Sequence, residues 1–243
     1  MFGPSGSSKF QQEFGSPTVA VTGAAGFIGS HLAERLLQLG CSVIGIDDFD
    51  PWYDLSQKRN NLLDVVENPN FELVDRALDH ETACAAFSRS SVVFHLAGRP
   101  GVQDSWGQGF VDSSRRNIEL TQQVFETSVE CDVSRVVYAS SSSVYGSGAT
   151  SLEIVPEPEP ISPYGVSKLV GEQLAHVYRH QGLEIAFGPN TYRKDAIKSC
   201  KFIIDFLKVE ATFWKKETFF RLHRIFDTIL KKGNHFLTKN RFL

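Results

Sequence analysis

Residues 22–29 read Thr22-Gly23-Ala24-Ala25-Gly26-Phe27-Ile28-Gly29, and this stretch with three glycines decides the fold. An apolar, β-branched run, PTVAVT (17–22), leads into it and predicts a strand. Apolar residues then recur at helical spacing through FIGSHLAERLLQLG (27–40), which predicts a helix that ends at Gly40. The chain therefore opens with a strand, a glycine turn and a helix.

The alternation of strand and helix continues along the chain. Further apolar runs predict strands at 42–47, 71–74, 91–98 and 134–140, and helical stretches are predicted near 56–66, 80–88, 112–129 and 163–181. Ser162 and Pro163 are typical of a helix N-cap and first position, and Gly182 would end the last helix. Continuous apolar strands alternating with helices indicate an α/β fold with a doubly wound parallel sheet, the Rossmann type.

The glycine turn suits a dinucleotide. Gly23 makes the tight turn, Gly26 lets the backbone approach a pyrophosphate, and Gly29 packs the helix against the strand. The pyrophosphate would lie at the positive helix N-terminus, where Phe27 and Ile28 begin the helix. Asp47 closes the second strand, where its carboxylate would bind the adenosine ribose and repel a 2′-phosphate, so NAD is the expected cofactor.

Tyr164 and Lys168 lie four residues apart on the predicted helix 163–181, which places both side chains on one face. A lysine ammonium beside a phenol favours the phenolate, so we expect the tyrosine pKa to be lowered toward the range where it exchanges protons. The pair alone is a common chance pattern on solvated helices, and its meaning depends on its context.

Composition excludes several classes of protein. The 243 residues contain no apolar run that would span a bilayer and the start, MFGPSGSSKF, lacks a secretion signal, so the cytoplasm is expected. Four cysteines without a CxxC pair or a nearby histidine cluster predict neither a metal site nor a disulfide framework. Residues 1–192 carry a net charge of −11 and the rest +8 without a recognition motif, so nucleic-acid binding is not expected.

Six motifs now occur together in order and spacing: TGAAGFIGSHLAERLL, the Asp after the second strand, HLAG (95–98), Asn117, ASSSSVYG (139–146) and SPYGVSKLVGE (162–172). In these residues the chain resembles the extended short-chain dehydrogenase/reductase family, the NAD-dependent sugar-nucleotide epimerases and dehydratases. IDDFDPWYDLSQKRNNL (46–62) is also similar to the corresponding segment of UDP-glucuronate 4-epimerases. The resemblance covers residues 17 to about 185.

The resemblance implies a catalytic set of Ser141, Tyr164 and Lys168. The Tyr164 phenolate would take the proton of a sugar hydroxyl at C4 while the carbon passes hydride to NAD, and Ser141 would hydrogen-bond the reacting oxygen. Lys168 would hold the phenolate and the nicotinamide ribose. The keto-sugar would then turn over and recover the hydride on its other face.

Further roles follow from the same resemblance. It implies that Leu78, Leu96, Ala97 and Asn117 contact or support the cofactor, together with Tyr164 and Lys168. It places Ser142, Ser143 and Tyr145 near a nucleotide-sugar substrate, with simple packing an equal alternative for Tyr145. His95 is expected to be a structural histidine rather than a base or a metal ligand.

Ser142 and Ser143 also favour one reaction within the family. Dehydratases of the family carry an Asp-Glu pair at these positions, and decarboxylases usually keep the Glu, so epimerisation is the expected reaction. The alternatives are an inactive NAD-binding fragment, and a dehydratase, reductase or dehydrogenase of the same superfamily. Members of the family often dimerise through helices like those at 112–129 and 163–181, so the resemblance also implies a homodimer.

The resemblance has two departures. Ala77-Leu78 stands where an Asp-Leu step would contact adenine, and Asp75 or Asp79 would have to compensate. After Leu183 the chain lacks the expected substrate domain. We therefore expect a flexible start (1–16), an NAD-binding domain (17–187) and a basic, Phe/Lys-rich segment (188–243). That segment is interpreted as a replacement C-terminus, a basic amphipathic interaction segment or a diverged substrate lid.

Overall fold

The computed structural model describes residues 16–148 and 157–188. The expectations for the start of the chain, for residues 149–156 and for the basic segment lie outside these residues, apart from Ser16 and Gly188. All described residues belong to one compact unit, Met1–Ser199, and the second unit, Cys200–Leu243, lies wholly outside them.

Six parallel strands form one sheet in the order β3-β2-β1-β4-β5-β6. Their bounds are β1 Thr18–Thr22, β2 Ser42–Asp47, β3 Phe71–Asp75, β4 Val92–His95, β5 Arg135–Ala139 and β6 Glu184–Gly188. The chain moves outward from β1 to β3 and then returns to β4 on the other side of β1. This reversal between β1 and β4 is the switch point where open α/β sheets bind ligands, outside the carboxyl ends of the strands. The predicted doubly wound parallel sheet is confirmed.

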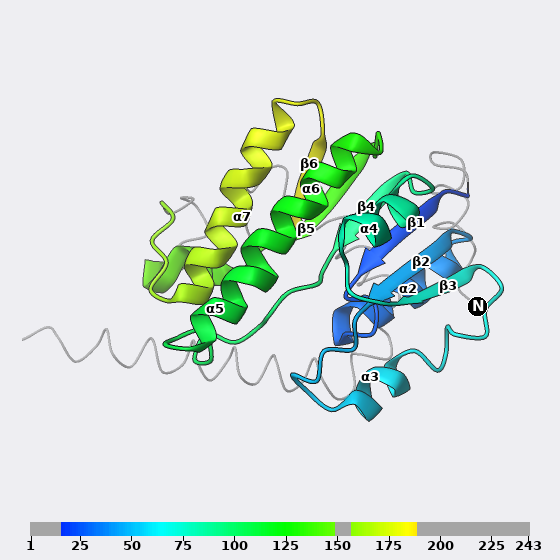
Figure 1. Cartoon of the computed structure of the whole chain (residues 1–243), viewed down its shortest axis with the longest axis horizontal. Helices are drawn as coiled ribbons and strands as arrows, with labels where there is room; N and C mark the ends of the chain where they lie inside the picture. The colour runs from blue at the N-terminus through cyan, green and yellow to red at the C-terminus, as the bar shows by residue number, and fades with distance from the viewer. Residues whose placement is uncertain (1–15, 149–156, 189–243) are drawn as a thin grey trace, which may run out of the picture. The chain divides into compact units, whose positions relative to one another are not determined.

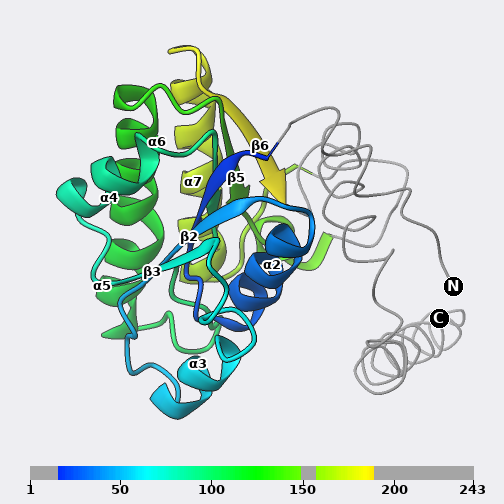
Figure 2. The same ribbon diagram turned by 90° about the vertical axis from the view of Figure 1, so that its right-hand side faces the viewer.

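Helices cover both faces of the sheet. They are α2 Phe27–Gln38, α3 Leu55–Asn61, α4 His80–Phe87, α5 Gly109–Ser114, α6 Leu120–Glu130 and α7 Pro163–Arg179. Helices α4, α6 and α7 lie together on one face and α2 lies on the other (Figures 1 and 2). Each of the helical stretches predicted from the sequence is present, although α3 is shorter than expected.

Two departures from the predicted elements matter for the site. The predicted helix at 112–129 begins earlier and is interrupted by a π-helical turn, Arg115–Glu119, which joins α5 to α6. Residues 184–188 were not predicted to form a strand, yet β6 pairs in parallel with β5 along its whole length. The sheet thus gains an outer strand beyond the one predicted last.

Helix ends are set by the residues that the sequence indicated. At the end of α2, Gly40 has φ 86°, and the amides of Gly40 and Cys41 donate to the carbonyls of Leu37 and Leu36 at 2.9 and 3.0 Å. This pair of bonds is a Schellman motif, which needs a left-handed residue and so favours glycine. At the start of α7, the Ser162 hydroxyl accepts from the Gly165 amide at 3.0 Å.

The core lies between the sheet and helices α4, α6 and α7. Tyr138 on β5 is almost fully buried, and its ring packs edge-on against Phe125 of α6 at 5.8 Å. His95 on β4 stacks on the other side at 5.9 Å. Close packing here fixes the carboxyl ends of β4 and β5, which carry the candidate site.

None of the helices in the described part of the chain has the length and apolar character of a membrane span.

Candidate functional site

Two of the three glycines of the first turn, Gly23 and Gly29, are required by close backbone contacts. Gly23 has φ +72°, and a Cβ built on it would lie 2.9 Å from the Ala97 amide nitrogen. A Cβ on Gly29 would lie only 2.1 Å from the Gly23 carbonyl oxygen. Any side chain at either position would force the turn away from β4 or from α2. Because glycine has no side chain, the backbone of this turn can pack closely against β4 and α2.

The N-terminus of α2 is open to an anion. Gly26 is the N-cap residue and supplies no capping side chain, while Phe27 and Ile28 are 55% and 63% exposed. The Tyr53 hydroxyl accepts a hydrogen bond from the Phe27 amide, so one oxygen acceptor already lies at the helix end. The structure brings the helix dipole and a glycine cradle together, the combination that binds phosphate groups.

Asp47 lies directly beneath the glycine turn, and its carboxylate is held by the protein. Oδ2 accepts from the Ala25 amide at 3.0 Å, and Oδ1 accepts from the Phe49 amide and from Lys58 Nζ, both at 2.9 Å. The side chains of Asp47 and Lys58 are only 4% and 7% exposed. Lys58 therefore balances the charge that was expected to repel a 2′-phosphate. Sequence reasoning missed this lysine, which falls on an unremarkable turn of α3.

A cavity of about 310 Å³ opens at the carboxyl ends of the strands. Six residues predicted to bind a cofactor line it: Gly23, Gly26, Asp47, Leu78, Leu96 and Ala97. Its lining does not include the other predicted cofactor-binding and catalytic residues, which are Phe27, Ile28, Gly29, Asn117, Ser141, Tyr164 and Lys168. Asp79, offered as a substitute for the missing adenine contact, instead caps α4 by accepting from the Thr82 amide at 2.8 Å.

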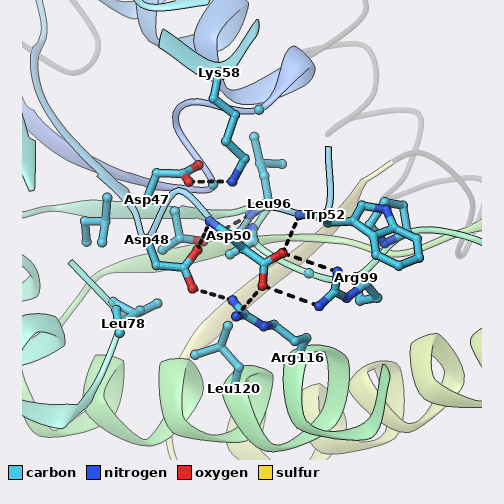
Figure 3. Close-up of a pocket in the computed structure, with 18 of the residues that line it drawn as sticks. Asp47, Asp48, Asp50, Trp52, Lys58, Leu78, Leu96, Arg99, Arg116 and Leu120 are labelled. Carbon is cyan, nitrogen blue, oxygen red and sulfur yellow. Dashed lines mark hydrogen bonds and ion pairs between the residues drawn. The ribbon is translucent and has the colours of Figure 1, made fainter. Parts of the chain in front are cut away.

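A network of four charges crosses this cavity (Figure 3). Arg99 makes two bonds of 3.3 Å to Asp50, and Arg116 of the π-helical turn binds the same carboxylate at 2.6 Å and also pairs with Asp48. Burial alone would raise the pKa of Asp48, but the hydrogen bond and the charge of Arg116 lower it on balance. The Arg99 guanidinium lies 4.4 Å from the Trp52 ring centroid. No role for Asp50, Arg99 or Arg116 was predicted from the sequence.

Ser141 and Tyr164 meet through a side-chain hydrogen bond. Tyr164 is oriented at the start of α7, where its amide donates to the buried Ser105 hydroxyl at 3.0 Å. Burial raises the pKa of Tyr164, and the hydrogen bond to Ser141 opposes this rise only in part. The expected lowering of the tyrosine pKa by Lys168 is therefore not found in this structure, because desolvation outweighs the charged neighbour.

Lys168 lies one turn along α7 from Tyr164, and its ammonium is buried. Nζ donates to the Ala139 carbonyl at 3.0 Å and lies 5.2 Å from the Tyr138 ring centroid. Burial lowers the pKa of Lys168 to about 8. The amine is held by its hydrogen bond to the β5 carbonyl of Ala139.

Asn117 joins the cavity to helix α7. It is fully buried; its Oδ1 accepts from the Arg99 amide at 2.7 Å, and its Nδ2 donates to the Arg99 carbonyl at 3.1 Å and to Ser167 Oγ at 3.0 Å. A Cβ on Gly98 would lie 2.9 Å from Asn117 Oδ1 and 3.6 Å from Lys168 Nζ. Asn117 thus positions the loop after β4, and its side chain and Lys168 Nζ both lie close to Gly98.

The other residues expected near the site differ in accessibility. Ser142 is exposed, Ser143 donates its amide to Ser141 Oγ at 3.2 Å, and Tyr145 is only 7% exposed. The three lie on a short 3-10 helix, Ser142–Gly148, directly after β5. Burial of Tyr145 favours the packing alternative for that residue.

His95 is a buried, neutral histidine with both ring nitrogens hydrogen-bonded. Nδ1 lies 2.8 Å from Thr22 Oγ1, which already accepts from two amides, and Nε2 lies 3.1 Å from Thr121 Oγ1, which donates to the Asn117 carbonyl. These roles place the hydrogen on Nε2. Burial, with a smaller contribution from Lys168, lowers the pKa of His95 to about 3. The arrangement fits the structural role expected from the sequence.

Comparisons with known proteins identify the family of this chain. The profile of the NAD dependent epimerase/dehydratase family matches residues 19–192. An uncharacterised UDP-glucose epimerase of Bacillus subtilis (strain 168), YtcB, is 41% identical over 162 residues, which are 66% of this chain and 51% of that protein. A UDP-glucuronate 4-epimerase of Thermodesulfobacterium geofontis is 34% identical over 174 residues, covering 68% of this chain and 53% of that protein.

A solved structure shares the fold as well. The UDP-glucuronic acid 4-epimerase from Bacillus cereus, in complex with UDP-glucuronic acid and NAD, is 33% identical, with a TM-score of 0.65 over 77% of this chain and 63% of that one. The chain spans about half the length of the curated relatives that it matches. Since the family profile covers well over half of the sequence, this chain belongs to the NAD-dependent epimerase/dehydratase family.

Proposed function

We propose that the chain carries the NAD-binding and proton-transfer half of a nucleotide-sugar 4-epimerase of the UDP-glucuronate or UDP-glucose type. The observation that carries the proposal is the hydrogen-bonded pair of Ser141 and Tyr164, with Lys168 one turn further along α7. Gly98 and Asn117 connect this group to the cavity behind the glycine turn. We infer that the base for a sugar hydroxyl and the dinucleotide cradle serve one site.

The residues present fit NAD. The side-chain-free backbone at Gly23 and Gly29 and the open N-terminus of α2 suit a pyrophosphate, and Leu78, Leu96 and Ala97 give the cavity an apolar wall for adenine. Asp47 keeps acceptor capacity for a ribose hydroxyl, because a carboxylate offers about four lone-pair sites and three are used here. Bound in this cavity, NAD would supply a reversible hydride acceptor.

The protein's own contribution is a proton relay at the sugar oxygen. Tyr164 Oη would exchange a proton with the C4 hydroxyl, while Ser141 Oγ, already bonded to Tyr164, would hold the same oxygen. The Lys168 ammonium would stabilise the phenolate once substrate excludes water from the site. Ser142 and Ser143 supply no carboxyl group for loss of water, which favours epimerisation over dehydration.

A second candidate is a protein that binds the cofactor without turnover. It is favoured because the lining of the cofactor cavity includes none of Ser141, Tyr164 and Lys168. Catalysis requires the sugar to be held in attack geometry beside the cofactor. A reductase that releases NADH is the third alternative, and net NADH formation would distinguish it.

Calorimetric titration of the full chain with NAD, and then with UDP and UDP-glucuronate in the presence of NAD, tests the proposal. Binding of NAD and of both UDP compounds, followed by C4 epimerisation without net NADH, supports it. Tyr164→Phe should abolish turnover and keep NAD binding, whereas Tyr178→Phe, a buried tyrosine on the same helix, should retain both. NAD binding with no response to either UDP compound would favour the second candidate.

We also propose a homodimer through the interrupted helix that runs from α5 to α6 and through α7. Phe110, Val111, Val166 and Val177 are exposed apolar side chains on these two helices, and covering them would remove apolar area from water. Gel filtration with light scattering is expected to give twice the chain mass. A monomer at micromolar concentration would refute this arrangement.

A further inference from the structure

A cluster of metal-ligating side chains lies between α4 and the end of α6, and none of its members lines the cofactor cavity. His80 and Cys84 are one helical turn apart on α4, which places both on one face. Glu130 is the last residue of α6, and Cys131 is its C-cap. The sequence predicted no metal site because these residues are nearly fifty positions apart along the chain.

Three of these side chains already lie within the span of one ion. The ligand atoms of His80, Cys84 and Glu130 all lie within 4.8 Å of one another. His80 Nε2 is 2.8 Å from Glu130 Oε2 and 3.6 Å from Cys84 Sγ. A tetrahedral zinc site with bonds of about 2.0 to 2.3 Å separates its ligand atoms by roughly 3.3 to 3.8 Å. The nitrogen–sulfur distance is within this range, and the nitrogen–oxygen pair would need to open by only about half an ångström.

Cys131 is the candidate for a fourth ligand; it lies beside the group of three and would have to turn toward it, since only His80, Cys84 and Glu130 already lie within 4.8 Å of one another. Its side chain hydrogen-bonds the Cys84 side chain, and its Sγ lies 4.0 Å from the Cys84 carbonyl oxygen, so the two sulfurs are neighbours. The four side chains together offer two sulfurs, one nitrogen and one oxygen. Two thiolates with an imidazole select a borderline or soft cation such as Zn²⁺ over Mg²⁺ or Ca²⁺.

We propose that His80, Cys84, Glu130 and Cys131 form a tetrahedral binding site for Zn²⁺ that fastens α4 to the end of α6. The local charge favours a cation. Glu130 and Cys131 lie at the C-terminus of α6, where unpaired carbonyls carry the negative end of the helix dipole, and Asp132 follows. Burial, the neighbouring Cys84 thiol and, to a smaller extent, Glu130 and Asp132 raise the pKa of the Cys131 thiol to about 11, and the charge of a bound cation would oppose that rise.

Cobalt substitution tests the proposal without reference to enzymatic activity. The full chain, reduced and freed of metal by a chelator, is titrated with Co²⁺ and then with Zn²⁺. We expect one equivalent of Co²⁺ to give the ligand-field bands of a tetrahedral site and a thiolate charge-transfer band, and one equivalent of Zn²⁺ to displace it. Cys84→Ser and Cys131→Ser should each lose about half of the charge-transfer intensity, since each removes one of two thiolates.

Matched variants control for adventitious binding. His80→Ala should weaken Zn²⁺ binding more than about tenfold, because loss of a direct ligand exceeds the effect of losing an outer-shell partner. His180→Ala, another exposed histidine, and Glu81→Gln, an exposed carboxylate on α4, should bind as the parent protein does. Absence of the charge-transfer band, or a band unchanged in Cys84→Ser, would overturn the proposal. So would a Cys84–Cys131 disulfide found by mass spectrometry in protein purified with Zn²⁺ and without reductant.

Discussion

Replacing the buried Lys168 with methionine is expected to stabilise the protein at neutral pH while removing a group proposed for catalysis. Methionine keeps most of the volume of the lysine stem but carries no charge. The ammonium lies in the protein interior, where it donates a hydrogen bond to the Ala139 carbonyl and lies over the Tyr138 ring. Taking that charge out of water is costly, and methionine avoids the cost.

The magnitude follows from the pKa. Burial lowers the pKa of Lys168 from 10.5 to about 8, and this difference corresponds to about 3 kcal/mol of lost stability wherever both states are charged. Losing the hydrogen bond to Ala139 should lower the free energy of unfolding by about 1 kcal/mol. The net gain in the free energy of unfolding is therefore about 2 kcal/mol near pH 7.

The effect of Lys168→Met on stability should depend on pH. Between about pH 8 and pH 10.5, Lys168 keeps its proton in the unfolded chain but has lost it in the folded protein. The free energy of unfolding of the parent protein therefore increases as the pH rises through this range, whereas Lys168→Met has no titrating group at this position and shows no such increase. The advantage of Lys168→Met should thus disappear by about pH 9.5. Urea unfolding of both proteins at these two pH values, without cofactor, measures the difference. Other titrating groups are common to both proteins and cancel.

Lys58→Met is the matched control, because Lys58 is equally buried but paired with Asp47. Its removal leaves a buried carboxylate with two amide donors and no counter-charge, so a loss of about 3 to 5 kcal/mol is expected. The two buried lysines should therefore respond with opposite signs. A Lys168→Met protein that is less stable than the parent at pH 7, or a difference independent of pH, would refute the reasoning.

Three further outcomes are expected. Gly29→Ala should lose about 1 to 3 kcal/mol of stability and all measurable NAD binding by calorimetry, because its Cβ would overlap the Gly23 carbonyl; unchanged NAD affinity would contradict this. Ser162→Ala should cost about 1 kcal/mol in urea unfolding by removing the cap on the Gly165 amide, with an unchanged midpoint as the contrary result. His95→Gln should flatten the loss of stability on acidification, because the unfolded histidine takes up a proton below its ordinary pKa of 6.5 while the folded one does so only near 3. For the parent protein this proton uptake costs about 2 kcal/mol at about pH 5, and equal acid sensitivity of the two proteins would exclude it.

Local patterns were sufficient to predict most of the sheet. The strand at 42–47 and the start of α7 at Pro163 agree with the structure because a continuous apolar run and a Ser-Pro cap act within a few residues. The last strand was missed for the opposite reason. Residues 184–188 form a strand by pairing with β5, a contact that no local pattern records.

Some residues of the candidate site could be predicted from the sequence and others could not, for the same reason. The glycine turn, Asp47 and the Tyr164–Lys168 spacing are readable because each depends on neighbours along the chain. Lys58 and the ion pairs of Arg99 and Arg116 are not, since their partners come from other loops at the carboxyl edge of the sheet. The pKa of Tyr164 was predicted in the wrong direction, because burial is a property of the folded chain rather than of the helix spacing.

The π-helical turn at Arg115–Glu119 acts as a one-residue insertion in an otherwise regular helix. Each α-helical residue advances about 100° around the axis, so deleting one residue from this turn would rotate everything before it by that angle relative to α6. Asn117 would then no longer face both Arg99 and Ser167. The extra residue sets the angular phase between the two halves of the helix, and with it the alignment of the cofactor loop with α7.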